Sequence, residues 1–97
     1  MSYVDEVLHL YLRLSDTPDR ARQLDRKLAA QFHQQQIPIE VVRAALLLGA
    51  ARRATRTPSC QPLQPIRSLH YFLPILEEVR SKPLDPAYID YLDRVAR

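Results

Sequence analysis

Glycine and cysteine are almost absent from this sequence of 97 residues, which contains one glycine, Gly49, and one cysteine, Cys60. A β-sheet protein of this length normally needs several glycines for its turns and bulges, so the composition argues against a β-barrel. A lone cysteine excludes an internal disulfide, and a lone glycine argues against a glycine-rich loop that cradles phosphate.

Long apolar runs are also missing. The longest, Ala44–Ala51, has eight residues, which is too few to cross a bilayer. The first residues lack the basic and then apolar stretch of a signal peptide. We therefore expect a cytoplasmic bacterial protein that does not associate with membranes. Apolar residues make up 46% of the chain, enough for one packed core, and the length predicts a single domain over residues 1–97.

Prolines are abundant, and most of the eight stand where a helix should begin. Together with apolar residues at three- and four-residue steps, they predict an all-α bundle of five short helices. The expected helices cover residues 2–14, 17–36, 38–55, 66–81 and 85–97. The second is expected to begin with Thr17 as its cap and Pro18 at its first position. Pro74 predicts a kink, or a break followed by a new helix.

The third expected helix is apolar almost all round, which is typical of a central helix with neighbours on several sides. We expect Leu46 and Leu47 to be buried there, and Gly49 to let another helix approach closely. After this helix, residues 57–65 (TPSCQPLQP) contain three prolines in nine positions. They predict a loop without regular structure.

Positive charge is concentrated in the middle of the chain. The whole sequence has 14 basic and 11 acidic side chains, but the stretch Ala51–Leu69 has four arginines and no acid. We call these four the arginine cluster: Arg52, Arg53, Arg56 and Arg67. Cations at a helix C-terminus can simply offset its partial charge, whereas four of them also suit phosphate binding. Both interpretations stay open, and replacing Arg52 and Arg53 is expected to leave folding nearly intact.

Two neighbouring features bear on nucleic-acid binding. Tyr71 follows Arg67 closely and could stack on an unpaired base, whereas Phe72 is expected in the core. The stretch Leu28–Ile39 has the layout of a helix-turn-helix, but the would-be recognition helix presents an acid, Glu40, near its start. Base-specific reading in the major groove is therefore the minor option.

We expect neither catalysis nor a metal or other cofactor. His70 stands ten residues after Cys60, but no residue that would orient such a pair is recognisable. Paired cysteine or histidine spacings typical of zinc sites are also missing from the sequence.

Tyr71, Ile75 and Leu76 stand at the spacings of a Tyr-x-x-x-Ile-Leu-x-x-Trp pattern, with Val79 at the tryptophan position. The preceding helix, Ile37–Arg53, also resembles the segment before the variable loop in the C-terminal domain of DnaD-type primosome proteins and phage replisome organisers. The resemblance extends over residues 28–79. It implies DNA binding during replication initiation or restart, with replication proteins as partners.

The sequence thus favours a small helical accessory protein of a replication or mobile-element system. It would bind nucleic acid, DNA rather than RNA, through Arg52, Arg53, Arg56, Arg67 and Tyr71. Two alternatives stay open. One is a protein-binding adaptor, which the apolar third helix and the tyrosines of the last helix favour. The other is a non-catalytic subunit of a larger nucleoprotein complex.

Overall fold

Five α-helices and one short 3₁₀ helix, η1, make up the regular part of the chain within residues 2–55 and 63–96, which the computed structural model describes. The expected all-α class is confirmed. The elements in chain order are α1 (Tyr3–Leu12), α2 (Gln23–Gln34), α3 (Ile39–Ala54), η1 (Leu69–Phe72), α4 (Leu73–Ser81) and α5 (Pro86–Ala96).

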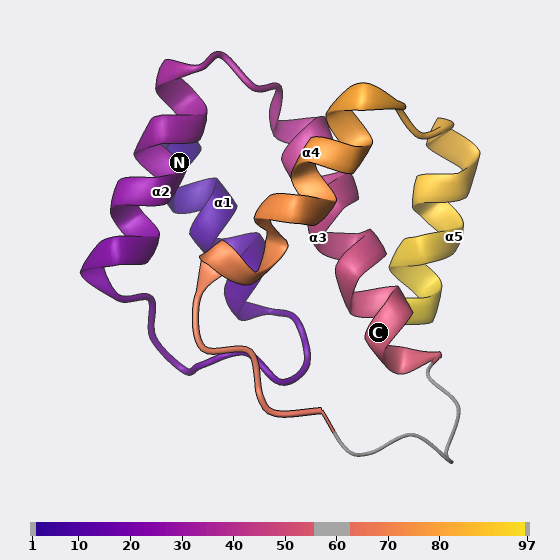
Figure 1. Cartoon of the computed structure of the whole chain (residues 1–97), viewed down its shortest axis with the longest axis horizontal. Coiled ribbons are helices and arrows are strands. Elements are labelled where there is room, and N and C mark those ends of the chain that lie inside the picture. The colour runs from indigo at the N-terminus through magenta and orange to yellow at the C-terminus, as the bar shows by residue number, and fades with distance from the viewer. Residues whose placement is uncertain (1, 56–62, 97) are drawn as a thin grey trace.

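Helix α3 occupies the centre, as its apolar sequence predicted. It packs against α1, η1, α4 and α5, while α2 packs against α1 and η1 (Figure 1). Leu46 and Leu47 are only 2% and 8% exposed, so their predicted burial is confirmed. A helix with apolar side chains on every face is stable only when neighbours cover those faces, and this arrangement supplies them.

Gly49 is the point of closest approach between α3 and the η1–α4 segment. A β-carbon built on Gly49 would lie 2.7 Å from Cε1 of Phe72 and 2.9 Å from Cδ1 of Ile75. Real β-carbons essentially never approach other heavy atoms so closely, so only glycine fits without a shift. The close approach that the sequence predicted at Gly49 is confirmed.

The second helix begins later than predicted, at Gln23 rather than near Thr17. The Thr17 hydroxyl donates to the carbonyl of Leu14 at 2.7 Å instead of capping a helix. Asp16, with φ of 66°, turns the chain, and its carbonyl accepts a hydrogen bond from the N–H of Ile66 at 2.8 Å. The local bond of Thr17 and the long-range bond to Ile66 thus keep Asp16 and Thr17 out of the helix.

Helix α2 ends in a Schellman motif without glycine. Gln36 has φ of 57°, and its N–H bonds to the carbonyl of His33 at 3.0 Å. The N–H of Ile37 reaches back to the carbonyl of Phe32 at 3.1 Å. This pair of bonds satisfies carbonyls at the helix end. The side chain of Ile37 is buried, and α3 begins two residues later, at Ile39.

The fourth predicted helix is broken, as Pro74 allowed. The residues before Leu69 are not helical, because Ile66 is buried and bonded to the Asp16 carbonyl. Pro74 lies in the first turn of α4, where its missing N–H costs nothing. Before α5, the Asp85 carboxylate accepts a hydrogen bond from the N–H of Ala87 at 2.8 Å, which confirms the predicted cap.

Most of the proline-rich segment lies outside the described residues, so its predicted irregularity is tested only at its end. Leu63 and Gln64 have no regular structure. The described apolar side chains form one core, which draws on α1, α2, α3, η1, α4 and α5.

Candidate nucleic-acid interface

Arg52, at the end of α3, lies against α4 through an ion pair with Glu78. The two nitrogens of its guanidinium fork lie 2.9 and 2.5 Å from the two carboxylate oxygens. Hydrogen bonding to Arg52 lowers the pKa of the Glu78 carboxyl and raises the pKa of Arg52 itself. Both side chains are about half exposed, at 52% and 51%, so other anions can still reach the guanidinium.

Arg53 points into the protein. Its side chain is only 8% exposed, which contradicts the expectation of a surface residue. The guanidinium donates to the Asp16 carboxylate at 3.2 Å and to the carbonyl of Gln64 at 3.0 Å. Its Nε is buried without a hydrogen-bond partner among the described atoms. Arg53 therefore holds the irregular stretch that precedes η1 against the turn that follows α1.

Tyr71 lies beside Arg53. The guanidinium carbon of Arg53 lies 5.4 Å from the centre of the Tyr71 ring, and its NH1 donates to the tyrosine hydroxyl at 3.4 Å. Tyr71 also meets the ring of Phe72 edge-on, with 5.1 Å between the ring centres. Phe72 is buried, as the sequence predicted, and Tyr71, whose position the sequence left open, is 41% exposed.

Arg67 is exposed in the irregular stretch just before η1. Arg56 lies outside the described residues. The structure therefore brings Arg53 and Tyr71 into contact, points Arg52 toward Glu78, and leaves Arg67 facing solvent.

Sequence analysis missed the acids that pair with the cluster. Asp16 and Glu78 stand 37 and 26 residues away from their arginine partners, so no local pattern indicates them. The stretch without acids in the sequence does not correspond to a surface without acids in the fold. Because the Arg53 side chain is nearly buried, we now expect its removal to destabilise the fold, unlike the expectation from the sequence.

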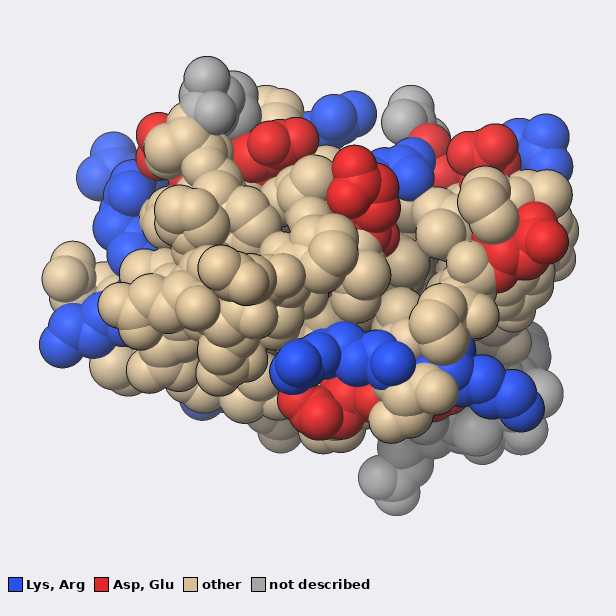
Figure 2. All heavy atoms as spheres, turned by 90° about the horizontal axis from the view of Figure 1, so that it is seen from above, with Lys and Arg blue, Asp and Glu red and all other residues tan. Residues whose placement is uncertain are grey.

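The opposite end of the bundle, near the start of α3, does not favour a polyanion. On this face blue and red side chains lie next to one another in several places, and a tan area without charge lies inside its left half, with blue side chains along the left edge (Figure 2). Positive charge interleaved with negative charge creates little net field.

The junction between α2 and α3 differs from a helix-turn-helix in its packing. The connection has the right length, since α2 ends at Gln34 and α3 begins at Ile39. However, α2 packs mainly on α1 and η1, whereas α3 packs mainly on α4 and α5. Glu40 is exposed near the start of α3, where it would face phosphates. This geometry favours backbone contact elsewhere over base reading by α3.

Residues 2–55 and 63–96 contain no group of three or more histidine, cysteine, aspartate or glutamate side chains that could hold a metal ion. Over the same residues, no helix combines the length and the apolar character that crossing a membrane requires. His70 is exposed on η1, and Cys60 lies outside the described part of the chain.

Comparisons with protein-family models, curated proteins and solved structures find no significant match to this chain. The resemblance to DnaD-type proteins therefore stays a prediction from the residues that carry it.

Proposed function

We propose that this chain is a non-catalytic nucleic-acid-binding accessory protein that contacts a phosphate backbone through Arg52 and Arg67. Tyr71 would stack on an unpaired base beside them. The observation that carries the proposal is the exposed Tyr71 ring, fixed on one side by the Arg53 guanidinium at 5.4 Å. Base–aromatic stacking suits a ring that is already held in place and exposed. Arg53 is then a positioning residue rather than a phosphate ligand.

The ion pair of Arg52 with Glu78 does not prevent phosphate binding. Both side chains are about half exposed, and ion pairs between exposed side chains contribute little to stability. A phosphate accepts the same two-pronged hydrogen bonding from a guanidinium as a carboxylate does. Phosphate can therefore replace Glu78 on Arg52 at small cost.

The resemblance to DnaD-type proteins supports DNA over RNA and a place in a replication or mobile-element system. Ile75, the second motif position, is partly buried and would meet a β-carbon at position 49 at 2.9 Å. Its role is therefore to pack α4 on α3. This packing holds Tyr71, on η1 just before α4, and Glu78, on α4 itself, in place.

The proposal is tested by measuring binding to labelled single- and double-stranded DNA by fluorescence anisotropy at several salt concentrations. With two or three phosphates neutralised, the log–log salt slope on duplex DNA should be about −2 to −3. Arg52→Ala and Arg67→Ala should each make the slope shallower by about one. Arg80→Ala is the matched control. Like Arg52, Arg80 is an exposed arginine in an ion pair, with Glu77 at 3.5 Å, but it is not part of the proposed site.

Tyr71 variants separate stacking from charge. Tyr71→Ala should weaken single-strand binding by ~1–3 kcal/mol and spare duplex binding, whereas Tyr71→Phe should keep both. Absence of binding to either DNA at the lowest salt, where electrostatic attraction is strongest, would remove the proposal.

A second candidate function, a protein-binding adaptor, is favoured by an exposed aromatic pair on α5. The rings of Tyr88 and Tyr91 stack with 5.9 Å between their centres, and the residues are 44% and 50% exposed. Exposed tyrosines are typical of protein interfaces. When a photo-crosslinking amino acid replaces Tyr91, irradiation should capture one partner protein. The same amino acid in place of the exposed Leu24 should not capture that protein. Two controls check that the capture depends on this pair. Tyr88→Ser should reduce the capture, and an excess of the same protein without the crosslinker should compete with it.

A further inference from the structure

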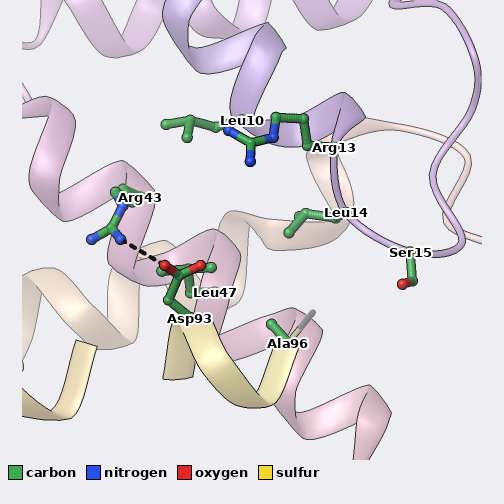
Figure 3. A pocket seen from close by; sticks show the side chains of 8 residues that line it. All are labelled: Leu10, Arg13, Leu14, Ser15, Arg43, Leu47, Asp93 and Ala96. Atoms are coloured by element: carbon green, nitrogen blue, oxygen red, sulfur yellow. Dashed lines mark hydrogen bonds and ion pairs between the residues drawn. The ribbon is translucent and has the colours of Figure 1, made fainter. Parts of the chain in front are cut away.

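A hollow of about 280 Å³ lies between the C-terminal end of α1, the middle of α3 and the end of α5 (Figure 3). Its apolar lining comes from Leu10 and Leu14 on the α1 side, from Leu47 on α3 and from Ala96 on α5. Ligand pockets are typically concave and mostly apolar, with a few convergent polar groups. This volume is just below the usual range for ligand pockets, which indicates a small ligand.

Three charged side chains reach the same space from three different elements. Arg43 on α3 meets Asp93 on α5 at 3.4 Å, and Arg13, just after α1, extends toward them from the opposite wall (Figure 3). Arg43 and Asp93 are 36% and 26% exposed, so this pair is partly withdrawn from water. Two guanidinium groups face one carboxylate, which leaves positive charge in the hollow.

Arg43 keeps hydrogen-bonding capacity for a ligand. A guanidinium has five N–H donors, and Asp93 engages Arg43 through one nitrogen at a long distance. Arg13 makes no ion pair with another residue in the described part of the chain. It offsets part of the negative partial charge at the end of α1, which would otherwise oppose an anion. A carboxylate placed between the two arginines would accept charge-assisted hydrogen bonds from both.

We propose that this hollow binds an organic carboxylate whose short apolar body lies on Leu10, Leu14 and Leu47 and whose carboxylate lies between Arg13 and Arg43. The ligand is either a free aliphatic acid or the C-terminal carboxylate of a peptide that ends in an apolar residue. This site is separate from the arginine cluster, and its occupancy does not depend on nucleic-acid binding.

The test is a titration of the full ¹⁵N-labelled chain with octanoate, followed by amide chemical shifts. Shifts should concentrate at the hollow, with a dissociation constant at or below about 1 mM for a ligand of this size. Octanamide, which has the same chain without the charge, should bind at least about tenfold more weakly. A peptide with a C-terminal leucine, compared with its C-terminally amidated form, distinguishes the two sources of the carboxylate.

Arg43→Gln and Arg13→Gln should each weaken binding of the preferred ligand about tenfold, and Arg80→Gln, which does not line the hollow, should leave it unchanged. Because Arg13 is exposed, its variant should fold even if Arg43→Gln does not, and thermal melting checks both. Equal binding of the acid and amide forms overturns the proposal. So does unchanged binding by the Arg13 variant, or the absence of shifts with both octanoate and the peptide at 10 times the expected constant.

Discussion

The Asp25 carboxylate, fully buried on α2, accepts a hydrogen bond from the backbone N–H of Leu69 at 2.9 Å, although 44 residues separate them. Its other oxygen accepts from the N–H of Arg22, also at 2.9 Å. One carboxylate thus caps α2 and the start of η1 together. A negative charge at the N-terminal ends of two helices is favourable, and the buried N–H of Leu69 is satisfied.

Replacing Asp25 is expected to destabilise the protein strongly. Asp25→Ala would leave the buried N–H of Leu69 without its partner and α2 without its cap, at a cost of ~2–4 kcal/mol. Urea denaturation followed by circular dichroism measures the loss. As a control, Asp19→Ala removes an exposed acid from the irregular stretch before α2 and should change stability by less than ~0.5 kcal/mol. Equal midpoints for the two variants would contradict the double cap.

Gly49→Ala should also destabilise the protein, against its helix propensity. Alanine in a helix is favoured over glycine by about 1 kcal/mol, but the new methyl would press on the rigid Phe72 ring. Overpacking of this kind typically costs ~1–3 kcal/mol, so the net change should be unfavourable.

Phe72→Leu in the Gly49→Ala background provides the control for that contact. If the ring is the obstacle, the double variant should be more stable than the sum of the two single changes predicts. An additive result would place the cost of Gly49→Ala elsewhere.

Tyr11 should make the protein sensitive to alkaline pH. Burial, and then the charge of Asp25, raise the pKa of Tyr11 from its ordinary 10.0 to about 12, with Arg22 acting in the opposite direction. Its contribution to stability is therefore complete below pH 10 and falls as the pH rises toward 12. The loss should approach about 1.4 kcal/mol per pH unit in that window.

Tyr11→Phe tests this dependence directly. The Tyr11 hydroxyl is buried without a hydrogen-bond partner among the described atoms, so its removal should be neutral or stabilising by up to ~1 kcal/mol at pH 7. Between pH 10 and 12 the variant should lose less stability than the wild type. Parallel denaturation curves for both proteins across that range would contradict the assignment to Tyr11.

Arg52 and Arg53, although adjacent, should differ in their effect on folding. Arg53→Ala removes contacts with Asp16, Gln64 and Tyr71 from a nearly buried side chain, and should cost ~1–3 kcal/mol. Arg52→Ala breaks only an exposed ion pair and should leave the denaturation midpoint nearly unchanged. Similar losses for both variants would contradict the different placement of the two side chains.

Local patterns predicted those parts of the fold that depend on neighbours in the sequence. The central α3, the cap at Asp85 and the break at Pro74 each follow from residues within one or two helical turns. The start of α2 was predicted wrongly, because the Asp16 carbonyl accepts a hydrogen bond from Ile66, 50 residues away. A capping signal at Thr17 gave no hint of that contact.

The candidate site was predictable only in part, for the same reason. The burial of Phe72 follows from its apolar ring, whereas the phenol of Tyr71, apolar with a polar tip, left its exposure undecided. The inward position of Arg53 depends on Asp16 and Gln64. One precedes α3 in the sequence and the other follows it, and only the fold brings them together. Charge density along a sequence therefore did not indicate which arginines face solvent.

Helix α5 packs mainly on α3, whereas α3 itself is covered on several sides. Local opening detaches first the units that have the fewest packed neighbours, and amide hydrogen exchange reports the free energy of each such opening. The amides of α5 should therefore exchange before those of α3, through a partly unfolded form in which α1 to α4 stay assembled. That form would remove Asp93 and Ala96 from the wall of the hollow and expose its α3 side around Leu47. A ligand that fills the closed hollow would therefore slow exchange throughout α5.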